Sequence, residues 1–235
     1  MEWTGEGLLI GVRRHGESSV IAEVMVVGRG RNLGLVRGGR SPKLGAVLQP
    51  GNTIQLTWRA RLEDHLGTFT VELLQARAAE LINDRTRLYL SQTVCDHLRL
   101  LPERDANDRM LGMALHLIDG APDGADLARF ELALLEDLGY GLDLSCCAVT
   151  GQTTGLTHVS PKSGRAVCRE AAQPYLDRLL PLPSFLTGRG NAGPHDIADA
   201  LHLSGHFLQA HLWGPRQQEP SPTRDLLITM LSKED

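Results

Sequence analysis

Residues 7–37 read GLLIGVRRHGESSVIAEVMVVGRGRNLGLVR, in which short runs rich in Leu, Ile and Val alternate with Gly, Ser and Asn. Apolar runs of this length, bounded by turn residues, are typical of β-strands. Two more follow downstream, which gives five predicted strands: residues 7–13, 20–27, 33–37, 53–59 and 68–74. Five short strands at such spacing predict a small β-barrel or sandwich. The Gly pair and the proline within residues 38–43 exclude a central strand and predict a basic loop.

The pattern changes after residue 78, where apolar residues recur every three or four positions, as in amphipathic helices. We therefore predict an α+β chain with a β-domain at residues 1–78 and a helical domain at residues 79–235. Residues 141–168 break the helical period and predict an ordered loop or small hairpin inserted in the second domain. The predicted helices are residues 80–101, 107–118, 125–138, 170–180, 194–211 and 223–231.

Composition limits the classes of protein to which the chain can belong. The first residues contain two acids and no basic segment, and no window approaches the roughly 20 apolar residues of a membrane-spanning helix. The four cysteines do not suggest a secreted disulfide framework. We therefore expect a cytoplasmic protein without membrane association.

The charge is distributed unevenly along the chain. The net charge is −4, but residues 1–80 hold ten Lys and Arg against eight Asp and Glu, a balance of +2 that leaves −6 for the remainder. Five basic residues follow one another without an acid between them: Arg29, Arg31, Arg37, Arg40 and Lys43. Such a segment suits a groove that tracks a phosphate backbone, although basic residues also protect exposed strand edges from pairing. Only Trp58 and Phe69 lie in the predicted strands as candidates for base stacking, and core packing explains both.

The sequence contains few of the motifs that are typical of enzymes. It contains neither a phosphate-binding Gly-Lys-Ser/Thr loop nor a G-x-S-x-G nucleophile motif, and residues 28–34 have the wrong spacing for a dinucleotide fingerprint. His202 and His206 stand four residues apart on a predicted helix, with His211 five residues on, a spacing that can bind a metal. Histidines on a helix surface are the simpler interpretation.

Two stretches resemble the RecO family of recombination-repair proteins. The first is EGLLIGVRRHGESS at residues 6–19, followed by GGRSPK at residues 38–43. The second is RFELALLEDLGY at residues 129–140, which continues through LDL, CAVTG and VSPKSGRA up to residue 166. The resemblance implies an OB-fold joined to a helical domain, with no catalytic residues and no cofactor.

It also implies a mediator of DNA repair and recombination, associated with the nucleoid. Members bind single- and double-stranded DNA, anneal complementary strands, pair with RecR, contact the acidic tail of single-strand-binding protein and help to load RecA. We predict phosphate contacts from a rim of seven residues: Arg13, Arg14, Arg29, Arg31, Arg37, Arg40 and Lys43. For the acidic tail we predict Arg129 beside Phe130, because an arginine can bind a terminal carboxylate through two hydrogen bonds. A surface arginine next to a core phenylalanine is the alternative.

Some relatives carry a four-cysteine zinc site in the inserted loop. On this sequence its two C-x-x-C pairs place Cys147 and Cys168 at the first positions, but Thr150 and Ala171 at the second. Neither a hydroxyl nor a methyl group completes a structural zinc site. We predict a zinc-finger-like loop without metal. A substitute set would be Cys146, Cys147, His158 and Cys168, but adjacent cysteines rarely share one metal.

Two other functions remain open at this point. A metal-dependent nucleic-acid hydrolase would use His202, His206 and neighbouring acids, and would lose activity to a chelator. A protein-interaction scaffold would not bind DNA even at low salt.

Overall fold

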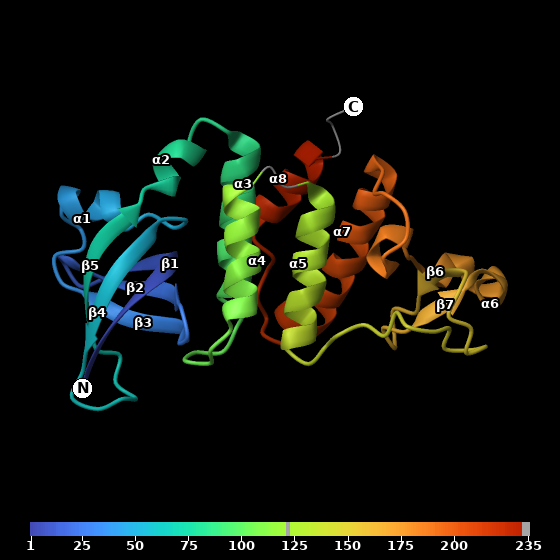
Figure 1. Ribbon diagram of the computed structural model, residues 1–235, viewed down its shortest axis with the longest axis horizontal. Helices are drawn as coiled ribbons and strands as arrows, with labels where there is room; N and C mark the ends of the chain where they lie inside the picture. Colours follow the sequence, from blue (N-terminus) through green and yellow to red (C-terminus); the bar gives the residue numbers. More distant parts are fainter. Residues whose placement is uncertain (121–122, 232–235) are drawn as a thin grey trace. The chain divides into compact units, whose positions relative to one another are not determined.

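The computed structural model describes residues 1–120 and 123–231. The chain forms two compact units, Met1–Gly120 and Ala121–Asp235, and each is described by itself. Within the described residues, no helix has both the length and the apolar character needed to cross a bilayer. The predicted α+β architecture, a β-sheet region followed by helices, is confirmed (Figure 1). The predicted boundary near residue 78 stays a prediction.

The first unit begins with a closed five-stranded barrel in the order β1-β2-β3-β5-β4. Its strands are β1 (Glu2–His15), β2 (Ser19–Val26), β3 (Gly30–Val36), β4 (Thr53–Arg59) and β5 (Thr68–Gln75). The first half of β1 pairs with β4 and its second half pairs with β2, so one long strand closes the barrel. Sequence patterning predicted this strand only from residue 7 and missed residues 2–6, where Gly5 stands between polar residues. A Cβ at Gly7 would lie 2.4 Å from the Met25 carbonyl oxygen, so this glycine permits the close approach of β1 and β2.

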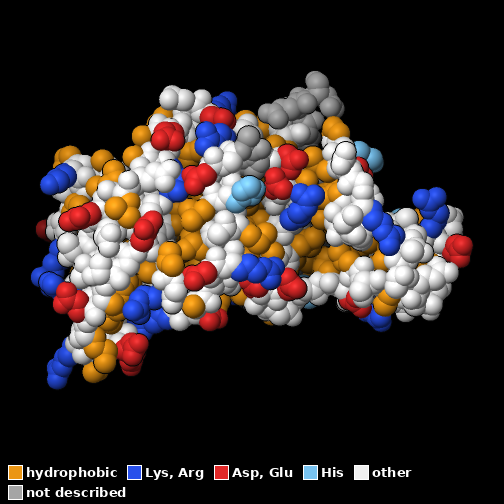
Figure 2. Space-filling view, in the orientation of Figure 1, with side chains coloured by type: hydrophobic (Ala, Val, Ile, Leu, Met, Phe, Trp, Pro, Cys, Tyr) orange, Lys and Arg blue, Asp and Glu red, His pale blue; other side chains and the backbone are white. Residues whose placement is uncertain are grey.

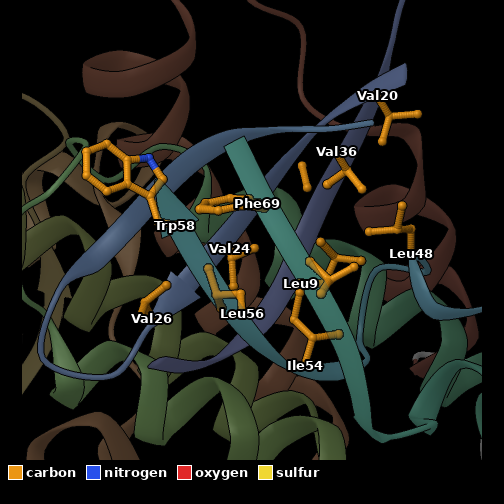
Figure 3. Packing of buried hydrophobic residues seen from close by; sticks show 12 residues of the cluster. Leu9, Val20, Val24, Val26, Val36, Leu48, Ile54, Leu56, Trp58 and Phe69 are labelled. Carbon is orange, nitrogen blue, oxygen red and sulfur yellow. The ribbon is translucent and has the colours of Figure 1, made fainter. Parts of the chain in front are cut away.

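Apolar side chains of all five strands fill the barrel. Figure 3 shows Leu9, Val24, Leu56 and Phe69 pointing toward one another, with Ile54 beside them. Gly34 makes room for this packing, since a Cβ there would lie 2.6 Å from the Phe69 ring. Trp58 and Phe69 are therefore core residues, in agreement with the simpler interpretation of their sequence positions.

A short helix, α1 (Pro42–Val47), stands between β3 and β4, where the sequence predicted only a loop. The Ser41 side chain accepts a hydrogen bond from the Leu44 N–H, and Pro42 occupies the first turn, where its missing N–H leaves nothing unpaired. The buried Asn52 side chain donates to the carbonyl oxygens of Ala46 and Val47, which fixes the end of the helix.

Three helices complete the first unit: α2 (Arg77–Leu81), α3 (Arg85–Leu98) and α4 (Asp108–Asp119). The prediction of one helix over residues 80–101 is wrong, because Asp84 has extended backbone geometry and its side chain caps α3 by accepting from the Arg87 N–H. Arg77 is buried and binds Asp119 and Thr53, which ties the end of α4 to β4.

Helix α3 packs against β1, and Arg99, which follows the helix, reaches the outer face of β2. The β2 residues that point away from the barrel interior, Ile21, Glu23 and Met25, are as buried as those that point inward. Glu23 pairs with Arg99 after α3 at 3.2 Å and with Arg31 of β3 at 3.1 Å. Both faces of β2 are thus packed against protein.

The second unit is built on α5 (Gly124–Asp137), α7 (Pro194–Leu208) and α8 (Pro222–Leu231). The Asp123 carboxylate caps α5 by accepting from the N–H groups of Ala125 and Asp126. A single π-helical turn, Gln209–Trp213, follows α7, so the predicted helix 194–211 changes its hydrogen-bonding pattern before its end.

The predicted insertion forms a hairpin of β6 (Leu156–Val159) and β7 (Ala166–Cys168), and β6 also pairs with β8 (Leu180–Pro181). A continuous helix over residues 170–180 is a wrong prediction. Only α6 (Arg169–Ala172) is α-helical there, and the 3₁₀ segment Gln173–Arg178 has non-helical backbone angles at Tyr175, directly after Pro174. A second 3₁₀ turn, Ser184–Thr187, was not predicted.

Candidate nucleic-acid interface

Five of the seven predicted DNA-binding residues lie at one end of the barrel. Arg14 pairs with Val20 across the β1–β2 hairpin, and Val20 pairs with Val36, so the end of β1 and the end of β3 meet. The Arg40 N–H donates to the Ser18 carbonyl oxygen at 3.1 Å, which holds the loop after β3 against the hairpin turn. We call this cluster the basic end: Arg13, Arg14, Arg37, Arg40 and Lys43.

The side chains of the basic end are exposed. Four of them, Arg13, Arg14, Arg37 and Lys43, have no carboxylate within salt-bridge distance in the part of the chain that the structure describes. The Arg40 guanidinium donates to the backbone carbonyl of Glu17, which orients it without neutralising it. Figure 2 shows Lys and Arg side chains along the left edge of the barrel. Their charges are therefore available to an anionic partner.

Two backbone features position this end. Gly38 has a φ of 65°, a left-handed conformation that glycine adopts without strain, and it turns the chain from β3 toward α1. The capped start of α1 then fixes the backbone at Lys43, which follows Arg37 and Arg40 closely in the sequence. The segment that the sequence predicted as a basic loop is thus a turn at Gly38 followed by the start of a short helix.

The structure does not bring Arg29 and Arg31 to the basic end. Both lie near the β2–β3 turn, at the opposite end of β3. Arg31 is largely buried, pairs with Glu23 at 3.1 Å and Glu103 at 3.6 Å, and donates to the Leu101 carbonyl oxygen. Its charge is already balanced by carboxylates of the first unit, so Arg31 stabilises the fold there.

Arg29 is exposed and lies over the Trp3 ring, 4.6 Å from its centroid. The Trp3 ring also stacks on Trp58, with ring centroids 5.7 Å apart. Together with Arg104 these side chains line a polar cavity of about 140 Å³. The Arg29 side chain thus packs on Trp3, away from the basic end.

Sequence reasoning did not single out Arg59, which the fold places near the basic end. It ends β4, forms an exposed ion pair with Glu2 at 2.8 Å and lines a groove together with Arg37. The hydrogen bond that Arg59 donates to the Glu2 carboxylate raises the pKa of Arg59 and lowers the pKa of Glu2. Only the strand order brings Arg59 near Arg37, so spacing along the chain held no signal for it.

The predicted tail-binding pair in the second unit divides into one exposed and one buried residue. Phe130 is fully buried in the core, so its ring cannot contact a peptide in this conformation. Arg129 is exposed, donates to Asp126 at 2.9 Å and lies 5.0 Å above the centroid of the Phe185 ring. An apolar ring does accompany the arginine, but it is Phe185.

The cysteine loop brings Cys147, Thr150 and Cys168 together. The Cys168 N–H donates to the Cys147 sulfur at 3.2 Å, and the Thr150 hydroxyl lies 3.6 Å from the Cys168 sulfur. Burial raises the pKa of Cys147, but hydrogen bonds from the Thr150 hydroxyl and from neighbouring N–H groups outweigh it and lower the pKa to about 6. Ala171 packs against the same cluster.

The substitute metal set is not assembled. Across residues 1–120 and 123–231, no three His, Cys, Asp or Glu side chains lie together in a way that could hold a metal ion. His158 contacts the Thr157 hydroxyl, and burial lowers the pKa of its ring. His206 contacts the Pro161 carbonyl oxygen at 3.4 Å, whereas His211 stacks on Tyr140. Both of these histidine rings also contact the Phe207 ring, and they do not form a metal site with a third ligand among the described residues.

Comparison with known proteins identifies the family. The family described as "Recombination protein O N terminal" matches residues 1–77, and "Recombination protein O C terminal" matches residues 82–219. The chain belongs to the RecO family. Its relatives named "DNA repair protein RecO" include that of Sinorhizobium medicae, 51% identical over 96% of this chain and 92% of the relative. Those of Mesorhizobium japonicum and Brucella abortus are each 50% identical over 99% of this chain, and over 94% and 97% of their own lengths.

The two RecO matches meet between residues 77 and 82, where β5 has ended and α2 runs from Arg77 to Leu81. The basic end lies wholly within the N-terminal RecO match. Arg129 and the cysteine loop lie within the C-terminal match. The candidate DNA surface and the candidate partner surface therefore belong to different parts of the family's sequence.

Proposed function

We propose that this RecO-family protein acts in DNA repair and recombination as a mediator that binds DNA through the basic end. The observation that carries the proposal is the cluster of five exposed basic side chains on a barrel, four of them without a carboxylate partner among the described residues. Unpaired basic groups on one surface bind phosphates by releasing counterions, without reading sequence. The barrel's strand order agrees with an OB-fold, whose small Greek-key barrels bind oligonucleotides.

Within the predicted rim, the basic end carries most of the phosphate contacts. Arg29 makes a separate contact at the opposite end of β3, next to Trp3. Arg31 contributes least, because binding a phosphate would require it to leave Glu23 and Glu103. Single- and double-stranded DNA both present the phosphates that such a surface recognises.

The finer roles follow from membership of the family. We propose that the protein anneals complementary strands, pairs with RecR and helps to load RecA on gaps coated by single-strand-binding protein. For the acidic tail of that protein we propose Arg129, backed by Phe185 instead of Phe130. The position of the guanidinium over the Phe185 ring supports this choice, because the ring supports its face while the N–H groups that do not bind Asp126 can bind a further carboxylate.

A charge-reversal experiment tests the proposed DNA surface. Replacing Arg37, Arg40 and Lys43 by Glu should abolish binding of labelled single strands in fluorescence anisotropy. The matched control replaces Lys162, Arg169 and Arg178 by Glu, which changes the net charge equally at exposed sites of the second unit. Unchanged affinity in the first variant, or equal loss in both, would contradict the proposal. Activity that appears with magnesium and disappears with a chelator would favour a hydrolase instead.

We further propose that the cysteine loop binds no structural zinc. Its donor set does not fit the metal, since Thr150 and Ala171 occupy two of the four ligand positions. The Thr150 hydroxyl and the Cys168 N–H supply the contacts to sulfur that hold the loop together. Elemental analysis of the untagged protein should find no zinc, whereas Thr150→Cys combined with Ala171→Cys should gain about one equivalent. Zinc near one equivalent in the wild type, lost with thermal stability in Cys168→Ser, would overturn the proposal.

A further inference from the structure

The barrel closes between β3 and β5 through a short contact only, and a gap lies beside β5 beyond that contact. A single residue pair, Leu35 with Thr68, joins β3 to β5 in the described structure. Strand β3 ends at Val36, whereas β5 continues to Gln75. The edge of β5 beyond Thr68 therefore has no neighbouring strand on that side, and α1 closes the gap only in part.

A groove of about 360 Å³ occupies this opening, within the roughly 300–1,000 Å³ that is usual for small-ligand sites. Its floor is apolar, formed by Val36, Phe69 and Val71 of the barrel core and by Leu44 of α1. Figure 3 shows Val36 and Phe69 at this part of the core. Its remaining lining residues are Arg37, Arg59, Thr68 and Thr70.

The groove combines three features that suit one flat, partly polar group. Its floor offers apolar contact, the β5 edge presents backbone N–H and C=O groups, and two arginines stand at its rim. Among the described residues no Asp or Glu lines it, although Glu2 pairs with Arg59 at its rim. Arg37 belongs to both the groove and the basic end, so a phosphate bound at the basic end would lie next to the groove entrance.

We infer that this groove receives an unpaired nucleobase of a DNA single strand whose phosphates are bound at the basic end. The inference rests on the proposed DNA-binding function and deepens it. Phosphates are common to single strands and duplexes, but the bases of a duplex are stacked and paired and cannot enter a groove without being extruded. The groove thus gives the protein a contact that only an unpaired strand can make.

The test compares two single strands of about 16 nucleotides, the upper end of the site size of an OB-fold. One is oligothymidylate and the other has the same backbone without bases. The wild type should bind the intact strand at least about fivefold more tightly, the lower end of what one base contact contributes. Equal affinity for the two strands would overturn the inference.

A variant that fills the groove tests the inference, and a matched variant outside the groove controls for it. Thr70 is exposed on β5 and lines the groove, so Thr70→Trp should fill it without disturbing the core. This variant should lose the preference for bases and keep the wild-type affinity for the abasic strand. Thr4→Trp, at an exposed position of β1 outside the groove, should keep the preference. Leu44→Gln, which makes the floor polar, should weaken the preference independently of Thr70.

The outcomes separate this inference from the proposed function. The triple reversal of Arg37, Arg40 and Lys43 could lower the affinity for both strands while the wild type binds the intact and the abasic strand equally. In that case the proposed DNA surface stands and the groove inference fails. If the triple reversal weakens neither strand, the proposed DNA surface itself fails. An acidic peptide that loses affinity in Thr70→Trp, while the preference for bases is unchanged, would assign the groove to a peptide and overturn the inference.

Discussion

Glu131 of α5 and Arg224 of α8 form a buried ion pair in the second unit, with two hydrogen bonds of 2.7 and 2.9 Å. Glu131 is completely buried and also accepts from the Ser204 hydroxyl of α7. Arg224 also donates to the Leu201 carbonyl oxygen at 2.8 Å. This pair therefore joins all three helices, and Gly205 makes room for it, since a Cβ there would lie 3.0 Å from the guanidinium.

Removing one partner of this pair should destabilise the second unit strongly. We expect Arg224→Met to lower the free energy of unfolding by about 3–5 kcal/mol, because it leaves the Glu131 charge buried without its partner. Replacing both residues, Glu131→Leu with Arg224→Met, should cost far less, since no charge is then buried. Urea unfolding followed by circular dichroism measures both. A double variant as unstable as the single one would contradict this account.

The salt dependence of DNA binding should report the number of engaged phosphates. If the five residues of the basic end each neutralise one phosphate, the slope of log affinity against log salt should be roughly −3.5 on single strands, from about 0.7 per phosphate. Arg37→Ala should reduce the magnitude of that slope by about 0.7. Arg31→Ala should leave the slope unchanged, because its charge is held by Glu23 and Glu103. Equal reductions in both variants would show that Arg31 binds phosphate as well.

The proposed tail contact depends on the guanidinium of Arg129. We expect Arg129→Ala to weaken binding of an acidic peptide with an apolar C-terminal residue, and Arg129→Lys to restore only part of the affinity, since lysine cannot make the bidentate contact. Arg169→Ala, an exposed arginine of the same unit, is the control. Isothermal titration calorimetry measures all three. Wild-type affinity in Arg129→Ala would place the tail elsewhere.

The thiol of Cys147 should make stability depend on pH near neutrality. Its pKa of about 6 in the folded protein lies below the roughly 8.5 of an unfolded cysteine, so its contribution is full above pH 8.5 and is lost as the pH falls toward 6. The free energy of unfolding of the wild type should therefore rise between pH 6 and pH 8.5 relative to that of Cys147→Ser. Cys95→Ser is the control, because burial raises the pKa of Cys95 to about 12 and its thiol stays protonated throughout. A pH profile of Cys147→Ser parallel to that of the wild type would show that the thiolate is not stabilised by folding.

The sequence predicted strands better than the helix–loop segments. Strand β4 has the predicted bounds because Gly51 and Asn52 precede its alternating pattern and the pattern ends at the charged Arg59. The break between α2 and α3 was missed because Asp84 fits the polar face of a continuous helix as well as it fits a cap. The short helix α1 was missed because Ser41 and Pro42, which begin it, are also typical of turns.

The sequence predicted which basic residues belong to the candidate site, but it did not predict which of them lie together in the fold. Arg31 and Arg37 are six residues apart on a strand, a separation of roughly 20 Å, so one basic segment of the sequence supplies two ends of the barrel. Partners such as Glu23 and Glu103 come from distant segments and decide which arginine is neutralised. Only the fold shows that Arg59 and Phe185 belong to the candidate sites, since no motif in the sequence around either residue predicts such a role.

The burial of both faces of β2 has a consequence for the proposed annealing of strands. Oligonucleotides bound by OB-folds commonly run across the strands of the barrel, but here the outer surface of β2 is packed against protein. The proposed DNA site, the basic end with its groove, therefore has a short footprint and would leave the nucleotides on either side of it in solvent. A complementary strand could then begin to pair with those nucleotides while the first strand is still bound. On this proposal, a short binding site hinders hybridisation less than a site that covers the whole strand.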